Sequence, residues 1–374
     1  MTKIKKEGWE IKKLGEIVNV RIGKLDANAA SEDGAYPFFT CSKEPLRISN
    51  YSYDCECVLI AGNGDLNVKY YKGKFDAYQR TYIITLKEGI SETTVPFVHK
   101  FFELYIENLR QKSIGGIIKY IKLGNITNAR IPLPPLPIQQ RIVEELDEIN
   151  AIISAKKQQL SKLDELAQSI FYDIFGDPVA NEKGWEVKKL GEETTDIKYG
   201  TSSPASPNGQ YKYLRMCNIS YDGHLDFSDL KYIDVPDAEI EKCIVRYGDI
   251  LFNRTNSLEL IGKTCMFDVE EPMVIAGYII RVRLTDKLHP RYVSVAFNLP
   301  SMKKLLRNMA KGAVNQANIN SKELASINIP LPPLPLQEAF AARVSAIEEQ
   351  KSSIAASIEK MQTLLDARMQ EYFG

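Results

Sequence analysis

The apolar positions of this sequence follow a helical period in two long stretches. The first extends from Pro137 to Gly176 and contains no Gly or Pro between these two residues. Its apolar positions alternate in steps of four and three, which is the pattern of a coiled-coil seam, so a long helix is predicted. The seam positions are Ile142, Leu146, Ile149, Ile153, Lys156, Leu160, Leu163, Ala167, Ile170 and Ile174.

A second stretch of the same period closes the sequence. Its seam positions are Phe340, Val344, Ile347, Lys351, Ile354, Ile358, Met361, Leu365, Arg368 and Tyr372. Lys156 interrupts the first seam and Lys351 the second, and a polar seam residue costs stability while restricting register, so these lysines are expected to fix how the helices align. Because each helix has a copy in the same chain, we expect an intramolecular pair, antiparallel if a pseudo-twofold relates the copies. Pairing between two chains is the alternative.

Two further segments occur twice and in the same order. GWEIKKLGE at residues 8–16 returns as GWEVKKLGE at residues 184–192, and IPLPPLPIQ at 131–139 returns as IPLPPLPLQ at 329–337. The chain is therefore an imperfect duplication. Between these markers the halves share only their apolar pattern. A constant frame with divergent inserts suits a protein that recognises two different things, and simple drift after duplication is the alternative.

The strand-like segments lie between the repeated markers. Residues 69–86 and 277–284 have the apolar pattern of strands. The predicted fold class is α+β, with two mixed, β-rich globular domains separated by the two long helices and related by pseudo-twofold symmetry. The predicted divisions are a first domain at 1–136, a first helix at 137–176, a second domain at 177–334 and a second helix at 335–374.

The composition is that of a soluble globular protein and favours no particular partner. Of 374 residues, 48 are Lys or Arg and 48 are Asp or Glu, so the formal net charge is zero. Binding to nucleic acid would then depend on local basic segments. No apolar core follows the basic N-terminus and the longest apolar run, near Val274 to Val282, is too short to span a membrane, so a cytoplasmic location is expected.

The sequence offers no convincing catalytic, metal or nucleotide site. Its six cysteines form no C-x-x-C pair and its three histidines are far apart, so reduced thiols and no metal are expected. Residues 257–264, SLELIGKT, resemble the end of a P-loop but lack its first glycine, and Gly62-Asn63-Gly64 is better explained by a hairpin turn than by a cofactor loop. No NPPY or DPPY segment and no acid-x-Lys spacing of a metal-dependent nuclease is present.

The first domain contains basic, aromatic and amide residues that could contact DNA. Lysines suit phosphates, whereas Gln and Arg suit base edges. One group is expected around a hairpin at Gly73, and another follows Gly115-Gly116. The candidates are Lys69, Tyr70, Tyr71, Lys72, Lys74, Tyr78, Gln79, Arg80, Lys119 and Tyr120.

In the second domain the candidates are polar residues in loops between strand-like runs. Asn315 and Gln316 occupy nearly the repeat position of residues 117–120, and amides can bond adenine in the major groove. For every candidate the alternative is a solvated loop residue. The set comprises Tyr199, Thr201, Ser202, Arg215, Asn218, Asn253, Arg254, Thr255, Asn256, Asn315 and Gln316.

Taken together, the doubled markers, the heptad helices and the segments GDILFNR and YIIRVRL resemble the specificity subunit of bacterial type I restriction-modification systems. The resemblance covers essentially the whole chain. It implies two target-recognition domains that each read one half of a split, asymmetric DNA site, with the helices as a ruler for the gap. It does not carry over individual DNA-contact residues.

The same resemblance implies partners and the absence of catalysis in this chain. Two methyltransferase subunits and a restriction subunit would bind it, and S-adenosylmethionine, ATP and Mg²⁺ would belong to those partners. Two other hypotheses remain open at this point: a structural coiled-coil adaptor, which would lack salt-dependent DNA affinity, and a fused nuclease or methyltransferase fragment, which would modify DNA alone.

Overall fold

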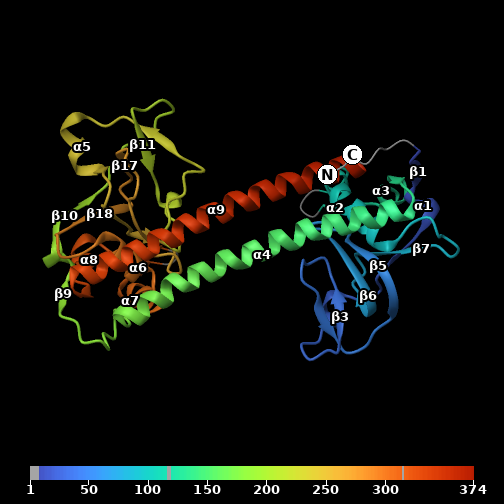
Figure 1. Ribbon diagram of the computed structural model, residues 1–374, viewed down its shortest axis with the longest axis horizontal. Coiled ribbons are helices and arrows are strands. Elements are labelled where there is room, and N and C mark those ends of the chain that lie inside the picture. The colour runs from blue at the N-terminus through green and yellow to red at the C-terminus, as the bar shows by residue number, and fades with distance from the viewer. Residues whose placement is uncertain (1–7, 116–118, 314–315) are drawn as a thin grey trace. The chain divides into compact units, whose positions relative to one another are not determined.

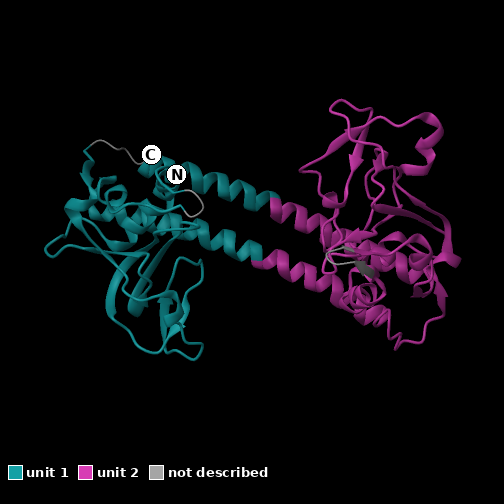
Figure 2. Cartoon of the chain, turned by 180° about the vertical axis from the view of Figure 1, so that it is seen from behind, with its two compact units in different colours: residues 1–157, 356–374 teal, residues 158–355 magenta. Residues whose placement is uncertain are grey.

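The computed structural model describes residues 8–115, 119–313 and 316–374, without the side chains of 311–313 and 316. The chain divides into two compact units (Figure 2). Unit 1 comprises Met1–Lys157 and Ala356–Gly374, and unit 2 comprises Gln158–Ala355. Among the described residues, no helix has both the length and the apolar character that a membrane crossing requires.

Unit 1 is built on a six-stranded sheet. Its order is β2 (Val18–Ile22), β7 (Thr81–Leu86), β5 (Tyr53–Ala61), β6 (Val68–Ala77), β3 (Tyr36–Phe39) and β4 (Leu46–Ile48). All neighbours are antiparallel except β3 and β6, and β5 and β6 form the long hairpin visible in Figure 1. The turn of this hairpin follows Ala61, so the turn predicted at Gly62-Asn63-Gly64 is confirmed.

Alternation along β5 gives unit 1 a separate apolar cluster on each face of the sheet. Val58 and Ile60 pack in one cluster with Phe97 and Phe101 of α2 (Val95–Gln111), a helix whose first turn is capped by the Thr94 side chain. Cys57 and Leu59 point to the other face, where they pack with Phe39 and Phe75. A short 3-10 turn, η1 (Ala27–Ala29), lies between β2 and β3.

The described part of unit 2 has shorter strands, which form three sheets and a separate two-stranded pair. The first has the order β10 (Thr194–Tyr199), β18 (Ile279–Leu284), β14 (Ile250–Asn253) and β16 (Thr264–Met266); the second has β12 (Lys231–Ile233), β11 (Tyr211–Leu214), β17 (Met273–Ile275) and β13 (Ile244–Val245); the third has β15 (Thr255–Asn256), β20 (Gln316–Asn318) and β19 (Lys311–Ala313).

Helices cover the first of these sheets. The core joins Ile250, Phe252 and Ile280 of the sheet to α6 (Pro290–Asn298) and α7 (Pro300–Met309). Unit 2 also contains the helical turns α5 (Asp237–Cys243), η2 (Leu190–Glu193) and η3 (Met216–Asn218). Strands and helices are thus mixed in both units, which confirms the α+β prediction.

The repeated sequence markers pair with one another in both units. The first GWE segment supplies β1 (Glu10–Lys13), which is antiparallel to β8 (Arg130–Leu133) from the first proline segment. The second copies supply β9 (Val187–Lys189) and β21 (Asn328–Pro330), again antiparallel. The turns α1 (Leu14–Ile17), α3 (Leu123–Thr127) and α8 (Ser321–Ala325) adjoin these pairs. The markers are therefore one structural frame, present twice.

A buried glutamine closes each proline segment and explains why the repeat extends to Gln139 and Gln337. The Gln139 amide donates to the carbonyls of Pro134 and Glu92, at 2.8 and 2.7 Å, and its oxygen accepts from the Thr93 hydroxyl. Gln337 bonds in the same way to the carbonyls of Pro332 and Lys287 and to the backbone amide of His289. Each glutamine thereby fixes the path from the proline segment into the following helix.

The two long helices are α4 (Leu136–Phe175) and α9 (Leu334–Phe373), each of 40 residues. In unit 1 the Tyr372 hydroxyl donates to Glu145, and in unit 2 Phe171 and Phe175 pack against Phe340. Late residues of one helix thus meet early residues of the other, which confirms the antiparallel intramolecular pair. All predicted seam residues are buried or half-buried.

The helix boundaries and the compact units do not coincide. The helices begin and end close to the predicted divisions, whereas the unit boundary falls inside each helix, after Lys157 and after Ala355. The four-part division and the pseudo-twofold relation stay predictions. At the end of α4 the Trp185 indole donates to the Phe175 carbonyl at 2.9 Å, so the second GWE segment also caps this helix.

Candidate nucleic-acid interface

In unit 1, three connections between elements meet at one edge, which we call the first loop edge. It consists of the turn at 62–67, the turn at 78–80 and the described residues of the loop at 112–122. The Gly62 amide donates to the Arg80 carbonyl at 2.7 Å, and the Gly64 amide donates to the Lys119 carbonyl at 3.0 Å. Asn63 bridges to Tyr120. Arg80, Lys119 and Tyr120, predicted from separate segments, are therefore brought together.

The prediction of a hairpin at Gly73 is wrong. Gly73 lies inside β6, opposite Cys55, and its φ of 132° marks an irregular strand position that glycine tolerates. The basic and aromatic residues around it consequently alternate between the two faces of the strand. They do not form one stripe.

Most of the candidate DNA-contact residues in β6 contact other residues of unit 1. Tyr71 packs on Phe39 with 5.0 Å between ring centroids, and the Lys69 ammonium donates to the Ser42 carbonyl at 2.7 Å. On the other face Tyr70 and Lys72 both contact Glu56. The exposed Lys74 lies over the Tyr51 ring. Tyr78 and Gln79 belong to the turn at 78–80, where the Gln79 amide reaches Asp26.

Unit 2 repeats the backbone geometry of this edge with different side chains. The Arg254 amide donates to the Tyr278 carbonyl, and the Ile319 amide donates to the Arg254 carbonyl, both at 2.9 Å. Gly62 makes the equivalent bonds in unit 1, with Arg80 and Ile121. The same backbone position therefore carries no side chain in unit 1 and a guanidinium in unit 2. We call the region of unit 2 around Arg254, Tyr278 and Ile319 the second loop edge.

The second loop edge collects several of the predicted residues. The Arg254 guanidinium lies over the Tyr199 ring, 4.9 Å from its centroid, and the Tyr199 hydroxyl bonds with Ser321 at 2.9 Å. Asn256 pairs with Ala317 between β15 and β20. Thr201 and Ser202 line a groove beside Tyr199. The backbone of Gln316 lies in β20, while Asn315 lies outside the described residues.

Four candidates of the second domain have structural partners instead. Asn218 is 1% exposed and donates to the Asp226 carbonyl at 2.8 Å, and Arg215 pairs with Asp229 at 2.7 Å. Asn253 is completely buried and its side-chain oxygen accepts from the Thr255 amide, and the hydroxyl of the nearly buried Thr255 donates to Asn318 at 3.3 Å. These four residues hold loops in place. Fewer residues of the second domain therefore remain as candidates for DNA contacts.

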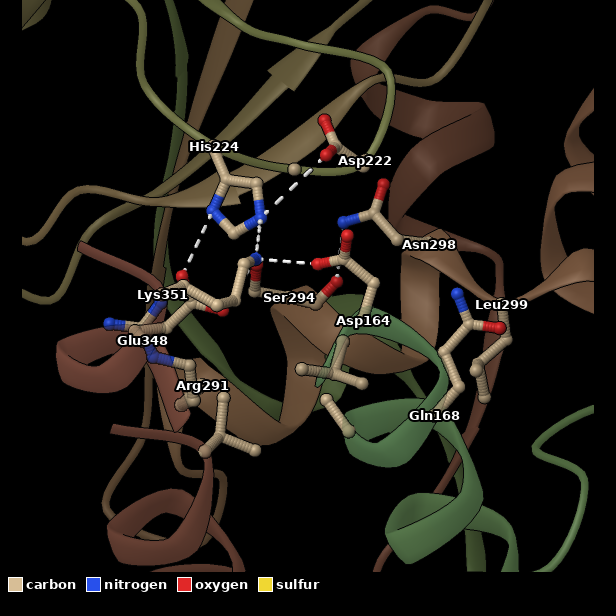
Figure 3. Close-up of a pocket in the computed structure, with 14 residues that line it drawn as sticks. Asp164, Gln168, Asp222, His224, Arg291, Ser294, Asn298, Leu299, Glu348 and Lys351 are labelled. Atoms are coloured by element: carbon tan, nitrogen blue, oxygen red, sulfur yellow. Dashed lines mark hydrogen bonds and ion pairs between the residues drawn. The ribbon is translucent and has the colours of Figure 1, made fainter. Parts of the chain in front are cut away.

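The seam residue Lys351 lies in a polar pocket of unit 2 (Figure 3). Its ammonium is 2.6 Å from Asp164 of α4, 3.2 Å from Glu348 and 3.2 Å from the His224 ring. Burial disfavours its charge, but the hydrogen bond to Asp164 and the charge of Glu348 outweigh burial and raise the pKa of Lys351. Lys156 is half-buried, and the described residues give it no comparable ion pair. A register role is therefore supported by contacts at Lys351 alone.

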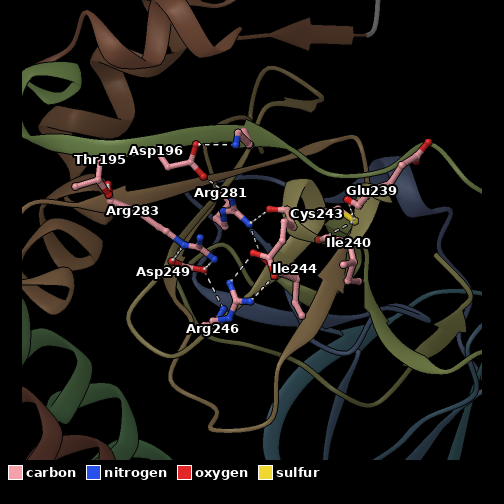
Figure 4. A network of polar contacts seen from close by, with 12 residues as sticks. Thr195, Asp196, Glu239, Ile240, Cys243, Ile244, Arg246, Asp249, Arg281 and Arg283 are labelled. Carbon is pink, nitrogen blue, oxygen red and sulfur yellow. Dashed lines mark hydrogen bonds and ion pairs between the residues drawn. The ribbon is translucent and has the colours of Figure 1, made fainter. Parts of the chain in front are cut away.

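A second polar network surrounds the arginines of the YIIRVRL segment (Figure 4). Arg281 is completely buried, pairs with Asp196 and donates to the carbonyls of Ile244 and Glu241. Arg283 pairs with Asp249 at 2.9 Å. Burial raises the pKa of Asp196, but Arg281 and Lys198 outweigh it, so the net pKa is lowered. This network connects the first two sheets of unit 2, and no pattern in the sequence indicates that Arg281 is buried.

Comparison with known proteins assigns both halves of the chain. A family model described as the type I restriction modification DNA specificity domain matches residues 6–165 and 182–361. The chain belongs to this family. Specificity subunits are the DNA-sequence-recognition components of their systems, so recognition is the role of this chain and the adaptor hypothesis is not supported.

Relatives and solved structures match this family member over nearly its whole length. The EcoDI specificity subunit of Escherichia coli is 28% identical over 380 residues, which cover 94% of this chain and 83% of that subunit. The MjaVIII specificity subunit of Methanocaldococcus jannaschii is 25% identical over 404 residues, which cover 96% of this chain and 92% of that subunit. The S subunit of M. genitalium has the same fold, with a TM-score of 0.63 at 13% identity, covering 100% of this chain and 98% of that one.

Proposed function

We propose that this specificity subunit reads a bipartite, asymmetric DNA target, one half with each loop edge. The observation that carries the proposal is the pair Gly62 and Arg254. Their backbones make the same hydrogen bonds, while their side chains differ completely. A constant frame with different side chains at equivalent positions would read two different sequences from equivalent positions. Guanidinium and amide groups are the side chains that discriminate base edges.

The helices are proposed to set the gap between the two half-sites. Each helix of 40 residues passes from one compact unit into the other. At about 1.5 Å per residue such a helix is about 60 Å long. A paired helix has a fixed length, whereas a flexible linker would permit many gap lengths.

The frame is proposed to bind two methyltransferase subunits, with a restriction subunit in the full complex. Its presence in both units supports two equivalent docking surfaces. Ile11 in β1 is 65% exposed, and its equivalent Val187 in β9 is 43% exposed, so each frame presents an apolar residue that a partner could cover. S-adenosylmethionine, ATP and Mg²⁺ are proposed to be bound by those partners, and the complex to act in the cytoplasm.

Methylation sequencing tests the proposal. DNA from a host that expresses this chain with its methyltransferase partner is compared with DNA from the same host without this chain. We expect a split methylated motif that disappears with the chain. Unchanged methylation, together with retained binding of the partner in a pull-down, would contradict recognition and favour an assembly role.

A second test replaces the variable residues that lie between the two markers of one unit. If residues 194–319 are replaced by the corresponding part of a relative, only one half of the methylated motif should change, because the other loop edge is untouched. A change in both halves would contradict the assignment of one half-site to each unit.

A further inference from the structure

The turn that begins with Arg254 rests on α7. Asn253 exchanges backbone hydrogen bonds with Lys263 and Gly262, which closes the turn at 254–262. A Cβ atom at Gly262 would lie 2.6 Å from Leu306 of α7, so the turn packs tightly on this helix. From the same helix, the Lys303 ammonium donates to the Gly262 carbonyl at 2.9 Å. The position of the second loop edge thus depends on α7.

Three cations lie around this contact, and we call Lys263, Lys304 and Arg307 the basic edge. Lys304 and Arg307 are exposed and three residues apart, so they share one face of α7. Lys263 closes the turn that carries Arg254. Within the described residues, none of the three has an ion pair with a carboxylate. Hydrogen bonds from the Glu259 backbone and from Ser257, and then the charge of Arg307, lower the pKa of Glu259.

Lys303 is the buried neighbour of these cations. Lys303 is 3% exposed, and its ammonium lies over the Tyr221 ring. Burial, and then repulsion from Lys263 and Arg307, lower the pKa of Lys303 to about 7, and Asp222 opposes this shift only partly. The charges of Lys263 and Arg307 therefore act on the buried Lys303, which places these cations close to the contact between α7 and the turn.

We propose that the basic edge binds backbone phosphates of the DNA whose bases face the second loop edge. The proposal rests on the proposed function and extends it to a site outside the reading residues. DNA phosphates supply these cations with an anionic partner, since no ion pair with a carboxylate is present at the basic edge among the described residues, and the turn at 254–262 links the basic edge to Arg254. Phosphate contacts of this kind fix the position of a reader on the duplex but do not select a sequence.

The test uses the full chain with its methyltransferase partner and the double variant K304A/R307A. Affinity is measured against salt concentration for a target duplex and for a scrambled duplex. Each lost phosphate contact makes the slope of log K against log salt shallower by about 0.9, so the double variant should lose roughly one to two units of slope on both duplexes. Thermal unfolding of the variant should match that of the wild type.

The matched control is K287A. Lys287 follows β18 at the end opposite Tyr278, where it pairs with Glu193, so its removal should leave the slope unchanged. The variant K304R/R307K, which keeps both charges, should retain the wild-type slope.

The outcomes separate this proposal from the function on which it rests. An unchanged slope in K304A/R307A, or a loss of slope on the target duplex alone, would overturn the phosphate site while recognition of the target stands. A wild-type complex that does not prefer its target would instead overturn the proposed function.

Discussion

At the scale of single residues, Lys303 shows how an interaction that orders a loop can also cost stability. Its hydrogen bond to the Gly262 carbonyl holds the turn at 254–262, but its ammonium is buried beside two other cations. In the unfolded chain the same group would titrate near its ordinary pKa of about 10.4. The folded pKa of about 7 therefore makes stability depend on pH.

The variant K303M should reveal this dependence. Below about pH 7 the lysine is protonated in both states, and its full penalty is present. As pH rises from about 7 towards 10, the unfolded state holds the proton that the folded state has lost, so the wild type should gain stability relative to K303M. Urea denaturation midpoints of both proteins at pH 6 and pH 9 measure the change.

The nearby exposed lysine gives the control for this measurement. K304M should show the same midpoint difference from the wild type at both pH values, because Lys304 is exposed. A pH-independent difference for K303M as well would show that Lys303 is not the group that titrates.

Residue-level roles were the hardest to predict from sequence. Lys351 was found because its helix has a strict period, so a polar residue at a seam position stands out. The burial of Arg281 could not be found in this way, because it depends on partners that are distant in sequence, such as Asp196 and Ile244. The prediction of a basic and aromatic group around a hairpin at Gly73 was wrong because these residues lie in a strand. Neighbouring side chains of a strand point to opposite faces.

At the scale of elements, the polar seam residues of the two helices are not equivalent. Lys351 of α9 connects Asp164 of α4 with Glu348 and approaches His224 from a loop of the recognition domain. It therefore joins three elements of unit 2. Lys156 has no such partners within the described residues.

Substitution by alanine should separate the two lysines. K351A leaves Asp164 and Glu348 without their shared cation in a partly buried pocket, and we expect a loss of about 1–3 kcal/mol in the free energy of unfolding, as for hydrogen bonds to charged groups. K156A should change this free energy by less than about 0.5 kcal/mol. Chemical denaturation of both variants gives the comparison, and equal losses would contradict a special role of Lys351.

The long helices and the frame were predictable because their signals are periodic or repeated. The strands of unit 2 were less so, because several contain only two or three residues, such as β13 and β15. A period of two cannot be recognised in so short a segment. Their pairing is determined by contacts across the fold, among them the Arg281 and Asp196 pair.

At the scale of the whole molecule, the duplication separates what must stay constant from what can vary. Each copy contains one pair of marker strands, β1–β8 or β9–β21. Each copy also contains one buried glutamine and one helix seam. At the equivalent backbone position the loop edges differ, with Gly62 in one copy and Arg254 in the other. Such an arrangement lets the recognised half-sites change without disturbing the frame that is proposed to bind the partners.

The same separation predicts that gap length and half-site sequence can be altered independently. Inserting one heptad into both α4 and α9 preserves the seam and lengthens each helix by about 10 Å. Since base pairs are spaced by about 3.4 Å, the preferred gap should grow by about three base pairs while both half-sites stay the same. Methylation sequencing of the insertion variant measures both properties. An unchanged gap in the double insertion would show that the helices do not set the gap.

Insertion of a heptad into α4 alone is the control. It should abolish methylation, because the helices could then no longer keep their pairing at both Glu145 and Asp164.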